Sequence, residues 1–212
     1  MSQVATDPPG APVTLVLDSA TARAVCGVVR AGRELAAASA EGGHAAQRAL
    51  VLVDEVLGRA GYEPKDVSRV VVGCGPGSFT GLRIGIATAR GLALALGVPC
   101  AGASTLGALG AGAPGAIALI DARRGELFAL DEEGTAVVEL PAAVAGRLAP
   151  GTLCVGDGAL RYRALLEEAG AVVPPDDDSR HAPPAVALAA LASGDAPEPV
   201  YVRRPDAEPQ VA

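Results

Sequence analysis

The hydrophobic positions along the chain form two kinds of pattern. Short apolar runs rich in β-branched residues predict strands, and longer runs with apolar positions three or four apart predict helices. We expect strands at 13–18, 23–30, 33–40, 67–74, 116–121, 126–130, 135–140 and 152–155. We expect helices at 45–60, 82–96, 142–148, 159–169 and 185–192, with a further short helix capped by Ser104. Strands interleaved with helices in this order favour an α/β fold.

The second half of the chain repeats the first half in outline. An apolar run ends in an acid at Asp18 and again at Asp121, and two strand-like segments follow each acid. Such a repeat indicates two lobes built on one plan, although any two antiparallel meanders share this outline. We expect a flexible N-terminus at 1–12, a first lobe at 13–110, a smaller second lobe at 111–195 and an extended tail at 196–212.

Two helices of the first half carry more apolar surface than a surface helix needs. Two apolar stripes run side by side at 45–60, and in the run 82–96 the polar residues are Arg83, Thr88 and Arg90. A helix that is apolar all round must be buried all round. Either the rest of this chain or another polypeptide covers the second face of each helix.

A glycine-rich loop precedes the helix at 82–96. It comprises Gly75, Pro76, Gly77, Ser78, Phe79, Thr80 and Gly81, and Arg83 follows it. Backbone N–H groups point at anions at such a strand-to-helix junction. The loop lacks the lysine of a Walker A motif and the third glycine of the dinucleotide fingerprint. Three interpretations stay open: a tight turn for close packing, an anion or nucleotide site, and a surface presented to a partner.

Charge and composition narrow the range of partners. The net charge is −7, and Lys65 is the only lysine, so phosphate neutralisation by this chain alone is disfavoured. Any role at a nucleic acid would run through a partner protein. The four cysteines, Cys26, Cys74, Cys100 and Cys154, form no C-x-x-C pair and are expected to be small buried hydrophobes of a reducing compartment, with disulfides or a zinc site as the alternative.

The start of the chain lacks the basic and apolar segments of a signal peptide. The apolar run at 82–96 is interrupted by two arginines and is too short to span a bilayer. We therefore expect a cytoplasmic protein with no membrane contact.

Catalytic and metal-binding sets are not evident in the sequence. His44 and His181 stand far apart, and neither has a second ligand at helical spacing, so no metal site is predicted. Asp18 and Asp121 stand at strand ends, where a phosphotransferase would hold a metal, but each could equally cap the turn that follows. No nucleophile, base and electrophile combine into a catalytic set, so we predict no catalytic residue.

Several segments closely resemble the TsaB (YeaZ) family, the glycoprotease-like branch of the actin, Hsp70 and sugar kinase superfamily. The loop and helix start at 75–85 carry the family signature, and three further segments at 17–20, 121–126 and 199–203 look like its other landmarks in the expected order. The resemblance implies an actin-like, duplicated two-lobed fold with a reduced second lobe. It also implies a non-catalytic accessory subunit required for threonylcarbamoyl transfer to the adenosine beside the anticodon of tRNA.

The same resemblance implies the partners. A member of this family forms a heterodimer with the catalytic subunit TsaD, helps recruit the ATPase TsaE, and uses its two first-lobe helices as the interface. Carried over to this chain, the interface is Ala46, Ala49, Leu50, Val53, Leu57, Gly85, Ala89, Arg90 and Ala93. We expect Leu50→Glu or Ala89→Arg to abolish the complex while the lobe stays folded.

Other outcomes stay open at this stage. A homodimer could use the same helical face, and ATP or ADP could bind at the joint of the assembled complex, although no cofactor is expected on this chain alone. The alternative function is an actin-fold ATPase or small-molecule kinase that uses the glycine-rich loop, Asp18 and Asp121 on phosphates.

Overall fold

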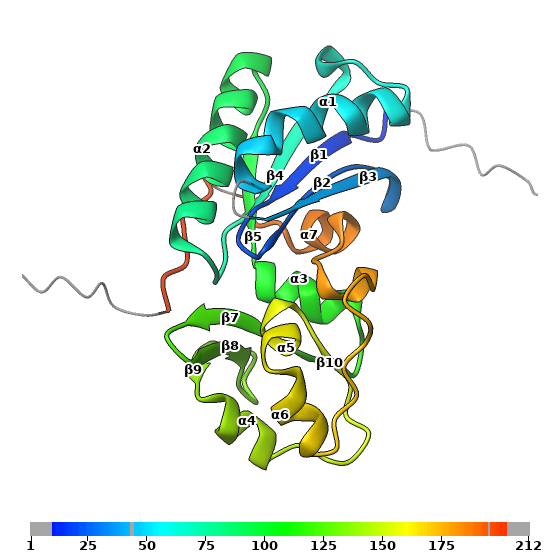
Figure 1. Cartoon of the computed structure of the whole chain (residues 1–212). Coiled ribbons are helices and arrows are strands. Elements are labelled where there is room, and N and C mark those ends of the chain that lie inside the picture. Colours follow the sequence, from blue (N-terminus) through cyan, green and yellow to red (C-terminus); the bar gives the residue numbers. More distant parts are fainter. Residues whose placement is uncertain (1–9, 43–44, 195, 203–212) are drawn as a thin grey trace, which may run out of the picture.

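The computed structural model describes residues 10–42, 45–194 and 196–202, and shows two lobes stacked end to end (Figure 1). His44 and the greater part of the predicted N-terminal segment lie outside the described residues, as do residues 203–212 of the predicted tail.

The first lobe is built on a five-stranded sheet with the order β3-β2-β1-β4-β5. Strands β1 to β3 are antiparallel, and β4 and β5 run parallel to β1. The bounds are β1 Val13–Asp18, β2 Arg23–Arg30, β3 Arg33–Glu41, β4 Arg69–Gly73 and β5 Cys100–Ala103. All six residues of β1 are buried, as expected for the central strand of a covered sheet. The sequence analysis missed β5, because its Cys-Ala-Gly-Ala sequence contains no β-branched residue.

Helices cover both faces of this sheet. Helix α1 (Ala49–Ala60), which follows the 3₁₀ turn η1 (Ala45–Arg48), lies with α2 (Phe79–Leu96) on one face and shares one apolar core with it. Helix α7 (Ala185–Leu191) covers the other face, where Ala185 and Leu188 pack with Val16 and Val71. The predicted boundary placed this last helix in the second lobe, and this assignment is wrong, because the chain returns to the first lobe to cover its sheet.

The second lobe is smaller and its strands are shorter. Its sheets have the orders β7-β8-β9 and β10-β6. The strands are β6 Ile117–Ala118, β7 Ile120–Arg123, β8 Glu126–Leu130, β9 Ala136–Glu139 and β10 Cys154–Val155. The helices are α3 Thr105–Gly112, α4 Pro141–Gly146, α5 Asp157–Arg161 and α6 Arg163–Glu168, and the remaining 3₁₀ turns of the described chain are η2 Pro64–Asp66 and η3 Ser179–His181. Helix α3 packs Leu106 and Leu109 into the core of this lobe, although the predicted boundary placed it in the first lobe.

The two lobes repeat one order of elements. A run of strands, a helix, a strand and a helix follow one another in each lobe: β1 to β3, α1, β4 and α2 in the first, and β6 to β9, α4, β10 and α5 in the second. Strand β6 pairs parallel with β10 as β1 pairs parallel with β4. The predicted α/β fold with two lobes and a reduced second lobe is confirmed.

Helix ends differ from the expected ones for local reasons. Helix α2 begins at Phe79 and not at 82, because the side chain of Ser78 caps it by accepting a hydrogen bond from the Gly81 amide. Gly61 and Gly97 end α1 and α2 in the left-handed conformation, with φ of 75° and 67°.

Helix α2 is long and apolar enough to cross a membrane by length and composition, and a third of its residues are buried. The sequence analysis judged this run too short, and the helix is longer than predicted because it includes 79–81. Its Leu82, Ile86 and Ala89 pack toward the sheet of an α/β lobe. One side of α2 is therefore packed on the lobe and the other side is exposed.

Candidate partner-binding surface and the junction of the lobes

The glycine-rich loop packs directly on the turn that follows β1. A Cβ atom at Gly77 would lie 2.2 Å from the carbonyl oxygen of Ala20, and one at Gly81 would lie 2.0 Å from that of Ser19. A Cβ atom at Gly73 would meet the side chain of Asp18, and one at Gly85 would meet the side chain of Ser19. The glycines therefore allow two backbones to approach, which is the first of the three interpretations left open by the sequence.

Several amides of this loop are already engaged within the chain. The Ser78 amide donates to the Ala20 carbonyl at 2.7 Å, and the Gly75 amide donates to Oγ1 of Thr105 at 3.0 Å. The Ser19 hydroxyl donates to the Gly81 carbonyl at 2.8 Å. The loop thus binds its own chain through groups that an anion would otherwise contact.

Asp18 lies at the centre of this junction and is buried. Its Oδ2 accepts a hydrogen bond from Thr105 at 2.6 Å, and its Oδ1 accepts one from the Ala20 amide at 2.9 Å. Burial raises the pKa of Asp18 to about 6, although both hydrogen bonds favour the ionised form. Asp18 therefore caps the turn after β1, as in the simpler of its two predicted roles.

Asp121 has the same local role in the second lobe. Its Oδ1 accepts from the Arg123 amide at 2.9 Å, and its Oδ2 lies 3.1 Å from Nη1 of Arg123 and 3.7 Å from Nη1 of Arg161. Among the described residues, no group of three or more histidine, cysteine or acidic side chains is placed to hold a metal ion.

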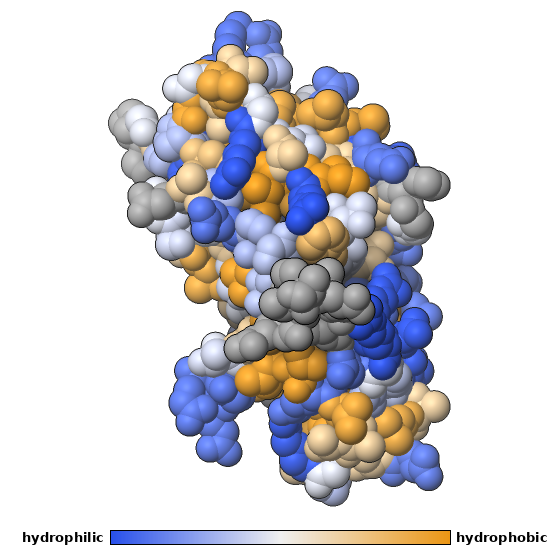
Figure 2. Space-filling view, turned by 90° about the vertical axis from the view of Figure 1, so that its left-hand side faces the viewer, coloured by the Kyte–Doolittle hydropathy of each residue, from blue (hydrophilic) through white to orange (hydrophobic). Residues whose placement is uncertain are grey.

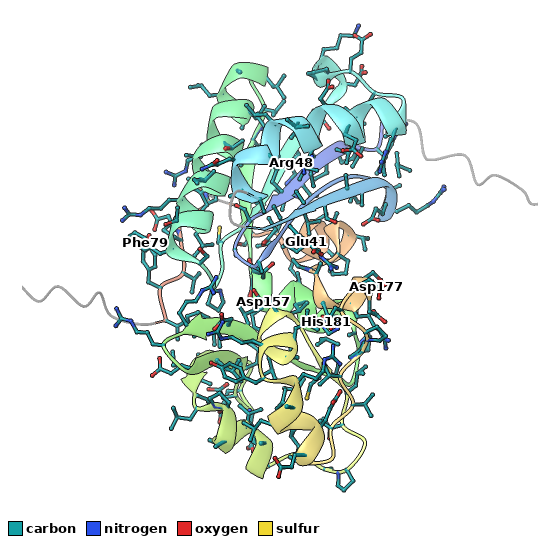
Figure 3. All side chains as sticks on the ribbon, in the orientation of Figure 1. Glu41, Arg48, Phe79, Asp157, Asp177 and His181 are labelled. Atoms are coloured by element: carbon teal, nitrogen blue, oxygen red, sulfur yellow. The ribbon has the colours of Figure 1, made fainter. Side chains whose placement is uncertain are left out.

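Asp157 connects the two lobes and was not predicted as a site residue. It is the first residue of α5, and its Oδ2 accepts from the Ala22 amide at 2.8 Å while its Oδ1 accepts from the Asp121 amide at 3.0 Å. Burial is the main cause that raises its pKa, and the neighbouring Asp121 adds to the effect. Its sequence signal was the Gly156-Asp157-Gly158 turn, which does not reveal a contact with the other lobe. Figure 3 shows Asp157 between the lobes.

His181 is buried close to the same junction. Its Nδ1 accepts from the Gly156 amide at 3.0 Å, and its Nε2 lies 3.1 Å from the Pro174 carbonyl oxygen. The ring therefore joins two loops of the second lobe.

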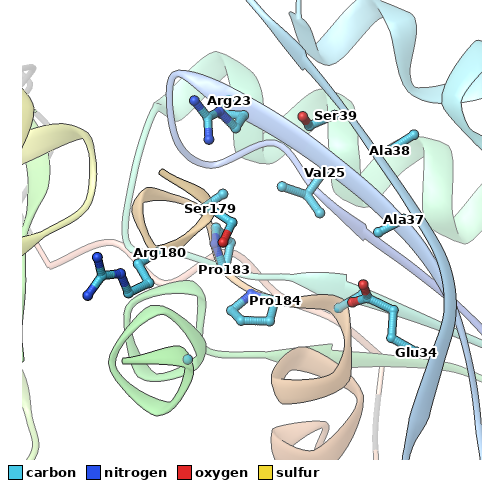
Figure 4. A pocket seen from close by; sticks show the side chains of 13 residues that line it. Arg23, Val25, Glu34, Ala37, Ala38, Ser39, Ser179, Arg180, Pro183 and Pro184 are labelled. Atoms are coloured by element: carbon cyan, nitrogen blue, oxygen red, sulfur yellow. The ribbon is translucent and has the colours of Figure 1, made fainter. Parts of the chain in front are cut away.

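A separate cavity of about 310 Å³ lies on the other side of the first-lobe sheet (Figure 4). Its lining includes Arg23 on β2, Glu34 on β3 and Arg180 on η3. Both arginines are bonded within the chain: Arg23 pairs with Glu41, and Arg180 pairs with Asp178 at 2.7 Å. Both guanidinium groups of this cavity are therefore already paired with acids of the same chain.

The outer sides of α1 and α2 expose large apolar residues. Leu50 is 59% exposed, Val51 is 58% exposed and Leu94 is 85% exposed. Ala87, Gly91 and Ala95 on α2 are also exposed. We call these six residues the apolar outer face. Figure 2 shows hydrophobic residues crossed by long hydrophilic side chains on the upper part of the side that α2 presents. Exposed leucines on adjacent helices are typical of a protein interface.

The structure corrects most of the predicted partner interface. Leu50 and Arg90 are exposed and Ala46 is half-buried, but the other six predicted residues are buried against the sheet of the same chain: Ala49, Val53, Leu57, Gly85, Ala89 and Ala93. On α1 they pack inward together with Leu52 and Val56, so both predicted stripes contribute to the core. Val51 and Leu94 were missed because a helix that is apolar on nearly every side does not reveal which side faces the sheet.

The segment 196–202, which we call the strap, lies along the first lobe. Its Val200 amide donates to the Cys74 carbonyl at 2.8 Å, and Nη2 of Arg90 donates to the Pro197 carbonyl. Tyr201 contacts Phe79 and Arg83 of the glycine-loop region. The described part of the predicted tail is therefore packed and not free.

Comparisons with known proteins agree with this architecture. The family described as "TsaD: tRNA N6-adenosine threonylcarbamoyltransferase" matches residues 38–143, half of the chain. An uncharacterised protein of Mycobacterium tuberculosis (strain H37Rv) is 35% identical over 207 residues, which cover 92% of this chain and 93% of that protein. TsaB of Escherichia coli K12, a tRNA threonylcarbamoyladenosine biosynthesis protein, is 46% identical over 88 residues, covering 39% of this chain and 38% of TsaB.

Solved structures extend the similarity to both lobes. YeaZ from Pseudomonas aeruginosa superposes with a TM-score of 0.67 at 27% identity and covers 90% of this chain and 99% of its own. The ethanolamine utilization protein EutJ from Carboxydothermus hydrogenoformans shares the fold alone, with a TM-score of 0.52 at 14% identity, covering 87% of this chain and 90% of EutJ.

The two stacked lobes and the repeated element order, which YeaZ and EutJ share, define an actin-like fold, as predicted. Within that class, the chain belongs to the TsaB (YeaZ) family.

Proposed function

We propose that this chain is a non-catalytic accessory subunit for threonylcarbamoyl transfer to the adenosine beside the anticodon of tRNA. It acts by forming a heterodimer with a TsaD-type catalytic subunit. Support comes from its TsaB-type relatives, which are named as tRNA threonylcarbamoyladenosine biosynthesis proteins. The match of half the chain to the TsaD family is consistent with a common ancestor of the two subunits.

The observation that carries the proposal is the apolar outer face of α1 and α2. Leu94 is the most exposed large apolar side chain described, and the exposed Leu50 and Val51 lie on the neighbouring helix. Covering such side chains contributes about 1.5–3 kcal/mol each when burial is complete. Exposed apolar side chains on two neighbouring helices suit packing against helices of a partner.

The remaining parts of the proposal concern the assembled complex. The chain helps recruit a TsaE-type ATPase, contacts tRNA only through its partners and acts in the cytoplasm. It holds no nucleotide alone, and ATP or ADP binds at the joint with the partner. The apolar outer face also supports a homodimer when the partner is absent.

Co-expression with the TsaD-type protein of the same organism, followed by size-exclusion chromatography, tests the heterodimer. We expect one co-eluting complex, and we expect Leu50→Glu and Leu94→Glu to weaken it at least about tenfold, because a charge would be buried in an apolar contact. Leu140→Glu is the matched control: Leu140 is 60% exposed, as Leu50 is 59% exposed, but lies in the second lobe.

Two results would count against this proposal. One is the absence of any complex with the unaltered chain, and the other is unchanged affinity in both outer-face variants. Calorimetry of the lone chain with ATP and magnesium complements the experiment, since tight binding followed by hydrolysis would favour the ATPase alternative.

A further inference from the structure

Three side chains from two distant parts of the chain form an exposed cluster beside the glycine loop. The guanidinium carbon of Arg83 lies 3.9 Å from the centre of the Phe79 ring, and the Tyr201 ring centre lies 5.6 Å from that of Phe79. Nε of Arg83 donates to the Tyr201 hydroxyl at 3.4 Å. Figure 3 shows Phe79 at the end of α2 nearest the second lobe, beside the strap.

The strap holds Tyr201 in this place. The backbone hydrogen bond from Val200 to Cys74 fixes the residue directly before Tyr201. The hydrogen bond from Arg90 fixes Pro197, which lies four residues before Tyr201. The cluster therefore joins residues 118 positions apart in the sequence. A pre-positioned cluster loses little side-chain entropy when a ligand binds.

The exposure of these rings is unusual for this chain. It contains two phenylalanines, three tyrosines and no tryptophan. Phe79 is 53% exposed and Tyr201 is 46% exposed, so two of its five aromatic rings meet at the surface. Exposed tyrosine and arginine side chains in contact are enriched among the residues that dominate protein interfaces.

The cluster combines a basic helix with a strap that carries one acid, Glu198, in a chain whose net charge is −7. Helix α2 contains Arg83 and Arg90 but no aspartate or glutamate. Among the described residues, Arg83 has no ion pair, and stacking on Phe79 leaves its outer N–H groups available. A guanidinium held over a ring presents a rigid fork that matches a carboxylate.

We propose that Phe79, Arg83 and Tyr201 form a second contact for the protein partner, which binds a carboxylate-bearing segment of that partner. The carboxylate pairs with the Arg83 fork, and the apolar part of the same segment covers the two rings. This inference rests on the proposed heterodimer. The cluster consists of other residues than the apolar outer face, but it adjoins that face because both lie on α2.

Affinity measurements on the full chain and the purified TsaD-type protein test the inference by calorimetry at low and high salt. We expect Arg83→Ala to weaken binding at least about tenfold, with a smaller loss at high salt because salt screens the ion pair. We expect Arg83→Lys to be intermediate, since an ammonium keeps the charge but lacks the planar fork. Tyr201→Ala should weaken binding more than Tyr201→Phe. Arg147→Ala, an exposed arginine of the second lobe, is the control and should change nothing.

The outcomes separate this inference from the proposed function. If the unaltered chain forms no complex, both are overturned. If the complex forms and the Arg83 and Tyr201 variants bind as the unaltered chain does, the cluster inference alone is overturned. A parallel titration with unmodified tRNA tests the alternative ligand of the cluster, because aromatic rings beside an arginine also stack on nucleobases. Loss of tRNA affinity without loss of partner affinity in Arg83→Ala would overturn the carboxylate assignment.

Discussion

Asp157 and Ala22 join the two lobes across 135 residues of sequence, with the Asp157 carboxylate accepting the Ala22 amide at 2.8 Å. The second oxygen of the same carboxylate accepts the Asp121 amide. One side chain thus satisfies an amide from each lobe, so it fixes how the lobes meet as well as adding stability.

We therefore expect Asp157→Ala to loosen the junction of the lobes. Two amides would lose their acceptor, and because the Ala22 bond is exposed and the Asp121 bond is partly buried, we expect a loss of about 0.5–1.5 kcal/mol for each bond. Urea unfolding should show the loss, and hydrogen exchange should accelerate at Ala22 and Asp121. Asp177→Ala, at an exposed acid, is the control. Unchanged exchange at Ala22 would contradict the role of Asp157.

The close contact of the glycine loop with the β1 turn predicts opposite effects for two glycines of one helix. In Gly81→Ala the new methyl group would overlap the Ser19 carbonyl, and overpacking of this kind costs about 1–3 kcal/mol. In Gly91→Ala the methyl group meets nothing within 4 Å. The second change should stabilise the protein by about 0.5–1 kcal/mol through helix propensity. Denaturant midpoints of the two variants test this, and equal shifts would refute the packing role.

The buried Asp18 predicts a pH dependence of stability. Its pKa is about 6 in the folded chain against 3.8 in the unfolded chain, so the folded state retains a proton that the unfolded state releases. Stability from this group is therefore present below about pH 4 and is lost as the pH rises through 6, by on the order of 3 kcal/mol.

In Asp18→Asn this dependence should disappear, because the amide carries no charge at any of these pH values. Unfolding free energies at pH 4.5 and pH 7 test the expectation. Between these pH values the unaltered chain should lose stability relative to Asp18→Asn, because each unit of pKa difference is worth about 1.4 kcal/mol. Parallel pH curves for both proteins would rule out the raised pKa.

The revised position of Ala89 changes the expected result of Ala89→Arg. Ala89 is fully buried in the core shared by α1, α2 and the sheet, so an arginine there should unfold the first lobe and not merely block a partner. Leu50→Glu should leave the fold intact, since Leu50 is exposed. Circular dichroism and thermal midpoints distinguish the two variants. A folded Ala89→Arg protein would contradict the buried position of Ala89.

The cysteines should react slowly with alkylating agents in the folded protein. Burial raises the thiol pKa of Cys26 to about 12 and of Cys74 and Cys154 to about 11, and only the thiolate is nucleophilic. Cys100 is half-buried and should be modified first. Mass spectrometry after timed alkylation at pH 8 gives the order, and guanidinium-unfolded protein supplies the reference rate. Rapid labelling of Cys26 would show that the core opens.

Local sequence was sufficient for most elements and for the identity of the loop. The alternating apolar runs predicted β1 to β4, and the paired acids and strands predicted a second lobe with the order of the first. Both signals are short-range, because side-chain periodicity follows directly from strand and helix geometry. The glycines at 77 and 81 were recognised from the local composition of the loop, although their partner, the β1 turn, was not.

The sequence by itself determined that α1 has two apolar stripes and that α2 is apolar on nearly every side, that the chain is acidic and short of aromatic rings, and that a glycine loop precedes α2. Only the tertiary structure decided which side of each helix faces the sheet, that α7 returns to the first lobe, and that Asp157 and Tyr201 meet residues more than a hundred positions away. The physical reason is that periodicity describes a helix around its own axis, whereas burial and long-range hydrogen bonds depend on where the rest of the chain packs.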